Sequence, residues 1–77
     1  MTELEFIQLV KRLRTLKKLN QKQMASILQI PISSYSRIEN GIYKLNFRII
    51  KNLSEVLDID LNVIKDVKLI DKIVYYD

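Results

Sequence analysis

Cysteine and histidine are both absent from this chain of 77 residues. Without thiols the chain forms no disulfide and has no thiolate nucleophile, and without imidazole it lacks a histidine base and the usual ligands of zinc sites. No grouping of Asp, Glu, Ser or Lys shows catalytic spacing, and so short a chain offers little room for a substrate pocket. We therefore expect a protein that is not an enzyme and that holds no metal and no other cofactor.

Long apolar runs are also absent. None approaches the roughly 20 residues that a membrane-crossing helix needs, and Met1 leads into a charged segment without the layout of a signal peptide. We expect a cytoplasmic protein with no membrane contact. No repeat or Gly/Ser-rich linker divides the chain, so residues 1–77 are predicted to form a single domain, close to the size at which one core gives only marginal stability.

Acidic residues are scarce in the first two thirds of the chain. Residues 1–51 contain ten lysines and arginines and three glutamates, a net charge of +7, whereas residues 52–77 contain three lysines and six acids, a net charge of −3. Most of these charges would solvate surface helices in any protein, but the asymmetry also fits one side that faces a polyanion and another that faces something else.

Glycine and proline occur once each, at Gly41 and Pro31. Upstream of Pro31, Asn20 followed by Gln23 predicts a capped helix that begins at Gln21. Pro31 ends that helix, and a second helix is predicted from about Ile32 to Asn40, closed by Gly41 in a left-handed conformation. Two short helices joined by a tight turn, over about residues 20–41, are typical of a helix-turn-helix.

These residues resemble the Cro and phage-repressor type of helix-turn-helix regulators, also called XRE-like. The resemblance is carried by Asn20-Gln21, by Ala25, and by the run Ser36-Arg37-Ile38-Glu39-Asn40-Gly41. It implies an all-α fold, a compact five-helix domain like that of lambda repressor. The chain departs from the family at two positions, where Gln29 replaces the usual Gly of the turn and Pro31 replaces the usual Ser or Thr cap.

Cap residues predict the remaining helices. Thr2 with Glu5 predicts a helix over Glu3–Lys18, Asn46 one over Phe47–Leu57, and Asp60 a fifth that begins near Leu61. The tail from Val67 to Tyr76 is predicted either to extend the fifth helix or to end in a short strand. The expected core side chains, with Ile7 and Leu9 as additional apolar surface, are Phe6, Val10, Leu13, Met24, Ala25, Leu28, Tyr35, Ile38, Phe47, Ile50, Leu53, Leu57, Leu61 and Ile64.

The resemblance also implies roles for individual residues in binding double-stranded DNA. The base-reading positions are Ile32, Ser33, Ser36 and Arg37. The positions that contact the DNA backbone are Gln21, Asn40, Tyr43, Lys44 and Arg48. Arg14 and Glu39 correspond to a partly buried ion pair of the family. An arginine suits guanine O6 and N7, and an isoleucine suits the thymine methyl group, although Arg37 binding only phosphate and Ile32 packing into the turn remain alternatives.

One helix-turn-helix reads about half a turn of the groove, so we expect a homodimer on an inverted repeat. Its interface is assigned to the acidic C-terminal half and a possible dimerisation tail, residues 66–77. The assigned residues are Leu57, Ile59, Val63, Ile70, Ile73, Val74 and Tyr75. A tail folded back on its own domain is an equal alternative. The expected function is a repressor or autoregulator, and the alternative is an antitoxin-type protein whose main role is to bind a protein partner.

Overall fold

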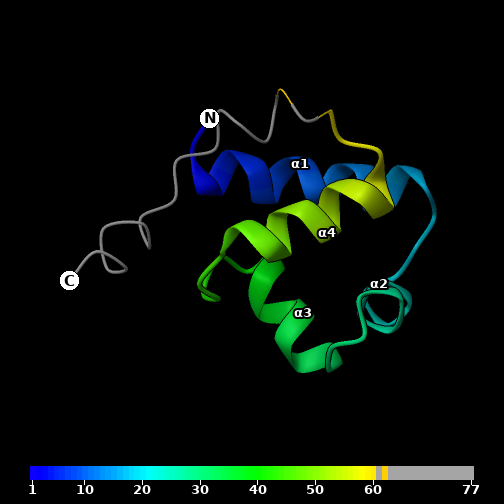
Figure 1. Ribbon diagram of the computed structural model, residues 1–77. Coiled ribbons are helices and arrows are strands. Elements are labelled where there is room, and N and C mark those ends of the chain that lie inside the picture. The colour runs from blue at the N-terminus through cyan, green and yellow to red at the C-terminus, as the bar shows by residue number, and fades with distance from the viewer. Residues whose placement is uncertain (61, 63–77) are drawn as a thin grey trace.

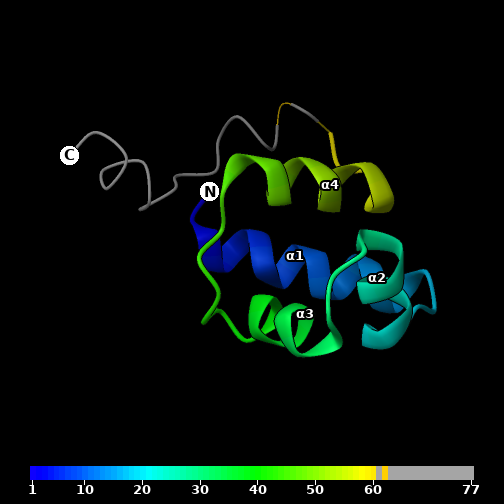
Figure 2. The same ribbon diagram turned by 60° about the horizontal axis from the view of Figure 1, so that its bottom comes forward.

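The computed structural model of the protein describes residues 1–60 and 62, and within them every regular element is an α-helix (Figure 1). The helices are α1 (Glu3–Leu16), α2 (Gln21–Leu28), α3 (Ile32–Glu39) and α4 (Phe47–Leu57). Helix α1 packs against both α3 and α4, and α2 lies near the C-terminal end of α1 (Figures 1 and 2). The all-α class is confirmed for this part of the chain, whereas the fifth helix and the tail lie outside the described residues.

The start of α1 follows the predicted capping box. The Thr2 hydroxyl accepts from the Glu5 amide at 3.1 Å, and the Glu5 carboxylate accepts from the Thr2 amide at 3.0 Å. The helix ends two residues before the predicted end at Lys18. Lys18 has a left-handed backbone with a φ of 59°, and the Leu19 amide donates to the Arg14 carbonyl, which turns the chain out of the helix.

The predicted capping of α2 is also confirmed, since Asn20 accepts from the Gln23 amide at 2.7 Å. The helix ends at Gln29, which adopts the left-handed conformation that the family usually gives to Gly, with φ 58° and ψ 44°. Pro31 then precedes α3 and supplies no side-chain cap. Gly41, with a φ of 75°, closes α3, because the Ile42 amide donates to the Arg37 carbonyl.

Helix α4 is capped as predicted by Asn46, whose side chain accepts from the Ile49 amide at 2.8 Å. It ends at Asp58, again in a left-handed conformation with a φ of 57°. Asp58 accepts a hydrogen bond from Lys17 Nζ at 3.1 Å, which ties the end of α4 to the end of α1. Asp60 then accepts from the Asn62 amide at 2.7 Å, as a helix cap would.

The core is formed by side chains from all four helices and from one connecting loop. Its buried hydrophobic residues are Phe6, Ile7, Val10, Met24, Ala25, Tyr35, Ile38, Leu45, Ile50, Leu53 and Leu57. Leu13 and Leu28 are partly buried and pack against it. Two predicted core residues, Leu61 and Ile64, lie outside the described part of the chain.

Three positions differ from the sequence-based prediction of the core. Phe47 is wrongly predicted as a core residue, since it is 63% exposed. It stands at the first position of α4, where Leu45, two residues earlier, fills the core from the loop and leaves Phe47 on the flank. Ile7, expected as additional surface, is buried, because α3 and α4 both pack against α1.

Leu57 was assigned both to the core and to a dimer interface. It is 2% exposed in the single chain, so it offers almost no surface to a second chain, and its assignment to the interface is wrong. Ile59 is partly buried and packs against the core. The other assigned interface residues, which all lie outside the described part of the chain, are Val63, Ile70, Ile73, Val74 and Tyr75.

Candidate nucleic-acid interface

The outer side of α3 carries the four positions predicted to read bases. Ile32 is 50% exposed, Ser33 and Arg37 are exposed, and Ser36 is partly buried. Ile32 with Ser36, and Ser33 with Arg37, are spaced by four residues and so are neighbours along the helix. The structure therefore brings these side chains together on one surface, with an apolar group, two hydroxyls and one guanidinium.

The opposite side of α3 anchors the helix in the protein. Tyr35 and Ile38 are in the core, and Glu39 at the C-terminal end is 3% exposed although it carries a charge. A buried carboxylate is stable only when it is paired and hydrogen-bonded. The contacts of Glu39 therefore decide how firmly the outer surface of α3 is presented.

Glu39 is held by side chains from both preceding helices. Arg14 of α1 donates from Nε to Oε2 at 2.5 Å and from Nη2 to Oε1 at 3.2 Å, and Gln21 of α2 donates from Nε2 to Oε1 at 3.1 Å. A third nitrogen of Arg14, Nη1, donates to the Leu19 carbonyl at 2.6 Å. One buried carboxylate thus joins α1, α2 and α3, and the ion pair implied by the resemblance is formed.

This environment changes the pKa of two groups. Burial acts to raise the pKa of the Glu39 carboxyl, but the hydrogen bonds and charge of Arg14, with contributions from Tyr35 and Gln21, outweigh it and hold that pKa below its usual value. Burial, followed by the neighbouring Glu39 carboxylate, raises the pKa of Tyr35. Glu39 is therefore charged at neutral pH while Tyr35 keeps its proton.

Gln21, which is predicted to contact a DNA phosphate, also has a partner within the protein. Its side chain is partly buried and donates to Glu39. An amide nitrogen carries two hydrogens, so the bond to Glu39 leaves one for an acceptor outside the protein. The sequence contains no local signal for the Gln21–Glu39 contact, because the two residues are 18 positions apart.

The remaining predicted backbone-contacting residues follow the end of α3. Asn40, Tyr43 and Lys44 are exposed in the segment that leads to α4, and Arg48 is exposed in the first turn of α4. The bond from the Ile42 amide to the Arg37 carbonyl fixes how this segment leaves α3. Two cations and two neutral polar side chains are therefore available here to an anionic backbone.

Sequence reasoning missed two residues that position this surface. Leu45 is 1% exposed and anchors the loop between α3 and α4, although an isolated leucine among polar residues carries no periodic signal. The Leu19 carbonyl orients Arg14 just beyond the end of α1.

Among residues 1–60 and 62, no cluster of acidic side chains could hold a metal ion, and no helix is both long and apolar enough for a bilayer.

Comparison with known proteins agrees with this geometry. A family model described as helix-turn-helix matches residues 10–64, which is more than half of the chain. No curated protein and no solved structure gives a significant match. The matched segment includes the second half of α1, both helices of the motif and all of α4. The chain therefore belongs to the Cro and phage-repressor type of helix-turn-helix DNA-binding regulators.

Proposed function

We propose that the protein is a sequence-specific transcriptional regulator, a repressor or autoregulator, that reads the major groove of double-stranded DNA with the outer side of α3. The observation that carries this proposal is the contrast between the two sides of α3. Ile32, Ser33 and Arg37 are exposed, while Tyr35 and Ile38 on the opposite side are in the core. Glu39 at the C-terminal end of the helix accepts hydrogen bonds from Arg14 and Gln21. A rigidly held helix with a mixed polar and apolar outer face suits base recognition.

In this proposal each exposed residue has a distinct role. Arg37 donates two hydrogen bonds to a guanine, Ile32 contacts a thymine methyl group, and the two serines supply adaptable hydrogen bonds. Gln21 uses its second amide hydrogen on a phosphate at the start of α2. Asn40, Tyr43, Lys44 and Arg48 contact the DNA backbone beyond the end of α3.

We further propose that two copies bind an inverted repeat. A single α3 of eight residues contacts too few base pairs to define a site, and two-fold dimers of such domains place their recognition helices about 10 bp apart. The C-terminal half, which is acidic, supports a dimer contact because the basic half stays available for DNA. Ile59 is the member of the assigned interface that remains partly exposed in the described structure.

Fluorescence anisotropy with DNA from upstream of the protein's own gene tests the proposal. The wild-type chain should prefer this DNA to a scrambled duplex at two salt concentrations. Arg37→Ala should weaken specific binding about 5- to 150-fold, which corresponds to the ~1–3 kcal/mol of a bidentate guanine contact. Weak, salt-sensitive binding to both duplexes should persist in this variant.

Arg12→Ala is the matched control, because Arg12 is an exposed arginine on α1, outside the two helices of the motif. It should retain the preference of the wild type. Equal and feeble binding of the wild type to both duplexes would contradict the proposal. If both arginine variants lost the same amount of affinity for the upstream DNA, Arg37 would contribute only a positive charge and would not read a base.

The exposed apolar side chains favour a second candidate function, an antitoxin-type protein that binds a protein partner. Ile42 is 72% exposed and Phe47 is 63% exposed, on the segment between α3 and α4 and at the start of α4. Exposed apolar surface of this kind is frequent at protein interfaces. A small toxin gene next to this one would support this function if its product co-purifies with the wild-type chain. The product should no longer co-purify with the Phe47→Ser variant.

A further inference from the structure

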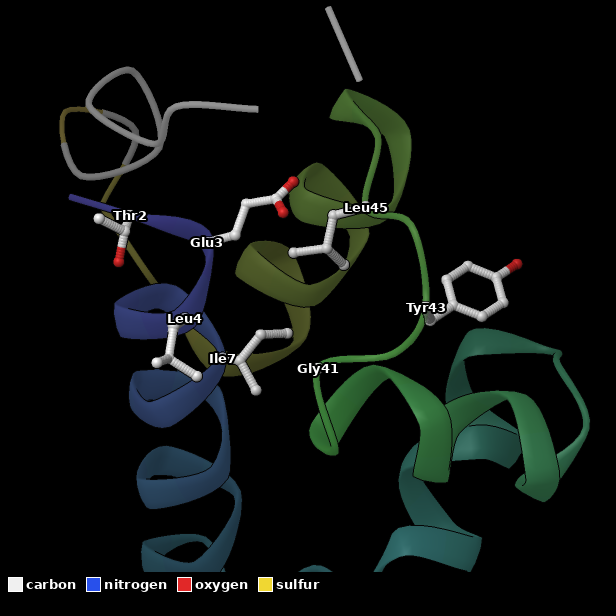
Figure 3. Close-up of a pocket in the computed structure, with 7 residues that line it drawn as sticks. All are labelled: Thr2, Glu3, Leu4, Ile7, Gly41, Tyr43 and Leu45. Carbon is white, nitrogen blue, oxygen red and sulfur yellow. The ribbon is translucent and has the colours of Figure 1, made fainter. Parts of the chain in front are cut away.

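A cavity of about 370 Å³ lies between the start of α1 and the loop that joins α3 to α4 (Figure 3). Ile7 and Leu45, both nearly fully buried, form part of its wall, and Leu4, which is 61% exposed, stands at its rim. Glu3 and Leu45 lie on facing elements of the cavity, while the ring of Tyr43 points away from Leu4 and Ile7 (Figure 3). The cavity therefore presents mainly aliphatic carbon.

Apolar side chains close in the chain to the lining residue Leu45 are also exposed. Ile42 is 72% exposed and Phe47 is 63% exposed. Filling an aliphatic cavity with an apolar segment lowers the free energy, because it removes apolar surface from water.

The rest of the chain contains a segment of matching chemistry. Of the fifteen residues 63–77, nine are apolar or aromatic, and four of these are consecutive in Ile73-Val74-Tyr75-Tyr76. The segment therefore matches the mainly aliphatic lining of the cavity in chemical character.

The length of the chain allows the segment to reach the cavity. The contact between Lys17 and Asp58 places the end of α4 at the C-terminal end of α1, whereas the cavity lies at the N-terminal end. Helix α1 has 14 residues and is therefore about 21 Å long. The eleven residues from Val63 to Ile73 span up to about 36 Å when extended, which exceeds this distance.

We propose that Ile73–Tyr76 occupies this cavity in its own chain. A tether of this length gives a local concentration in the millimolar range, which favours the chain's own cavity over that of a second copy. This assigns Ile73, Val74 and Tyr75 to a contact within one chain and leaves Ile59, Val63 and Ile70 for the dimer.

The inference deepens the proposed DNA-binding function and rests on it for its consequence. The wall of the cavity includes Gly41, Tyr43 and Leu45, from the segment that also carries the predicted backbone contacts. A filled cavity holds this segment in one conformation, so less entropy is lost when it contacts DNA. Docking of the tail should therefore strengthen DNA binding without touching the DNA.

Nuclear Overhauser effects measured on the full chain without DNA test the docking itself. Cross-peaks are expected between the ring protons of Tyr75 or Tyr76 and the methyl groups of Leu4, Ile7 or Leu45. Leu4→Glu places a charge at the rim and should remove them, as should the double variant Ile73→Ser with Val74→Ser, which keeps the tyrosine rings that report the contact. Leu16→Glu, at another exposed leucine of α1 that does not line this cavity, should retain them.

Absence of these cross-peaks in the wild type would overturn the inference. Cross-peaks found only between differently labelled chains in a mixed sample would also overturn it, because the occupant would then be a second copy. The proposed function is tested separately by the anisotropy measurement. If the chain shows the cross-peaks but no preference for its upstream DNA, the docking proposal stands and the DNA-binding proposal is contradicted.

Discussion

Glu39 is the residue on which the presentation of α3 depends. Its carboxylate is buried and receives hydrogen bonds from Arg14 and Gln21. Arg14→Ala leaves this charge without its main partner, and breaking one side of a buried ion pair costs about 3–5 kcal/mol. That is a large part of the stability of so small a domain.

Urea unfolding measures this loss directly. Arg12→Ala, at an exposed arginine two positions away, should change the free energy of unfolding by less than about 0.5 kcal/mol. If Arg14→Ala were as stable as Arg12→Ala, Arg14 would be an ordinary surface charge.

The lowered pKa of Glu39 gives the protein a defined response to acid. Because the pKa is lower in the folded chain than in the unfolded chain, its contribution to stability is complete above the unfolded value of about 4.3. The contribution is lost as the pH falls through the lowered folded value. Unfolding free energies between pH 5 and pH 2.5 should therefore fall more steeply for the wild type than for Glu39→Gln. Parallel curves would show that Glu39 does not titrate in this range.

Residues that act through distant partners were the hardest to predict. The Arg14–Glu39 pair spans 25 positions, and only the family resemblance suggested it. Gln21 was expected to meet only phosphate, and its bond to Glu39 was not foreseen. Phe47 was misplaced because the helical period alone cannot tell that Leu45, in the preceding loop, already fills the core.

At the scale of elements, local chemistry predicted the helix starts well. Thr2, Asn20 and Asn46 each cap the helix that was expected after them, because a cap is a contact between residues three positions apart. The helix ends were less predictable. Lys18 adopts a left-handed conformation that its side chain does not favour, so α1 stops earlier than its sequence indicates.

Left-handed residues end all four described helices, and only one of them is a glycine. Gln29 has a φ of 58°, which costs a residue with a Cβ about 1 kcal/mol relative to glycine. Gln29→Gly should therefore raise the melting temperature by about 4–8 °C in thermal unfolding followed by circular dichroism. Ser26→Gly, at an exposed helical position of α2, should lower it.

Gly41→Ala provides the reverse of this test. A Cβ at Gly41 would meet no heavy atom within 4 Å, so any loss of stability would come from the backbone φ of 75° alone. The expected loss is about 1 kcal/mol. A neutral Gly41→Ala, or a Gln29→Gly that lowers the melting temperature, would show that these turns do not require a left-handed residue.

For the molecule as a whole, the sequence predicted an all-α class and the position of the helix-turn-helix. The cap residues with the single Pro and Gly indicated the two helices of the motif, and the family resemblance implied the all-α class. The sequence did not predict how α1, α2 and α3 meet at Glu39, or that the loop before α4 supplies Leu45 to the core. These features depend on tertiary packing, which is not encoded in any short segment.

At the scale of the whole molecule, we propose that two copies place two α3 helices in successive major grooves of one inverted repeat. Each Arg37 would then cover the N7 atom of a guanine, at positions related by the two-fold axis. Nothing in a single chain fixes this spacing, so it depends on the dimer. Protection of guanine N7 from methylation reports both contacts at once.

Dimethyl sulfate footprinting of the upstream DNA is therefore the most direct measurement. Protected guanines are expected in two half-sites whose centres lie about 10 bp apart, with protection lost at both in Arg37→Ala and kept in Arg12→Ala. Uniform protection along the duplex, or the same footprint in wild type and Arg37→Ala, would contradict the claim that α3 reads an inverted repeat through Arg37.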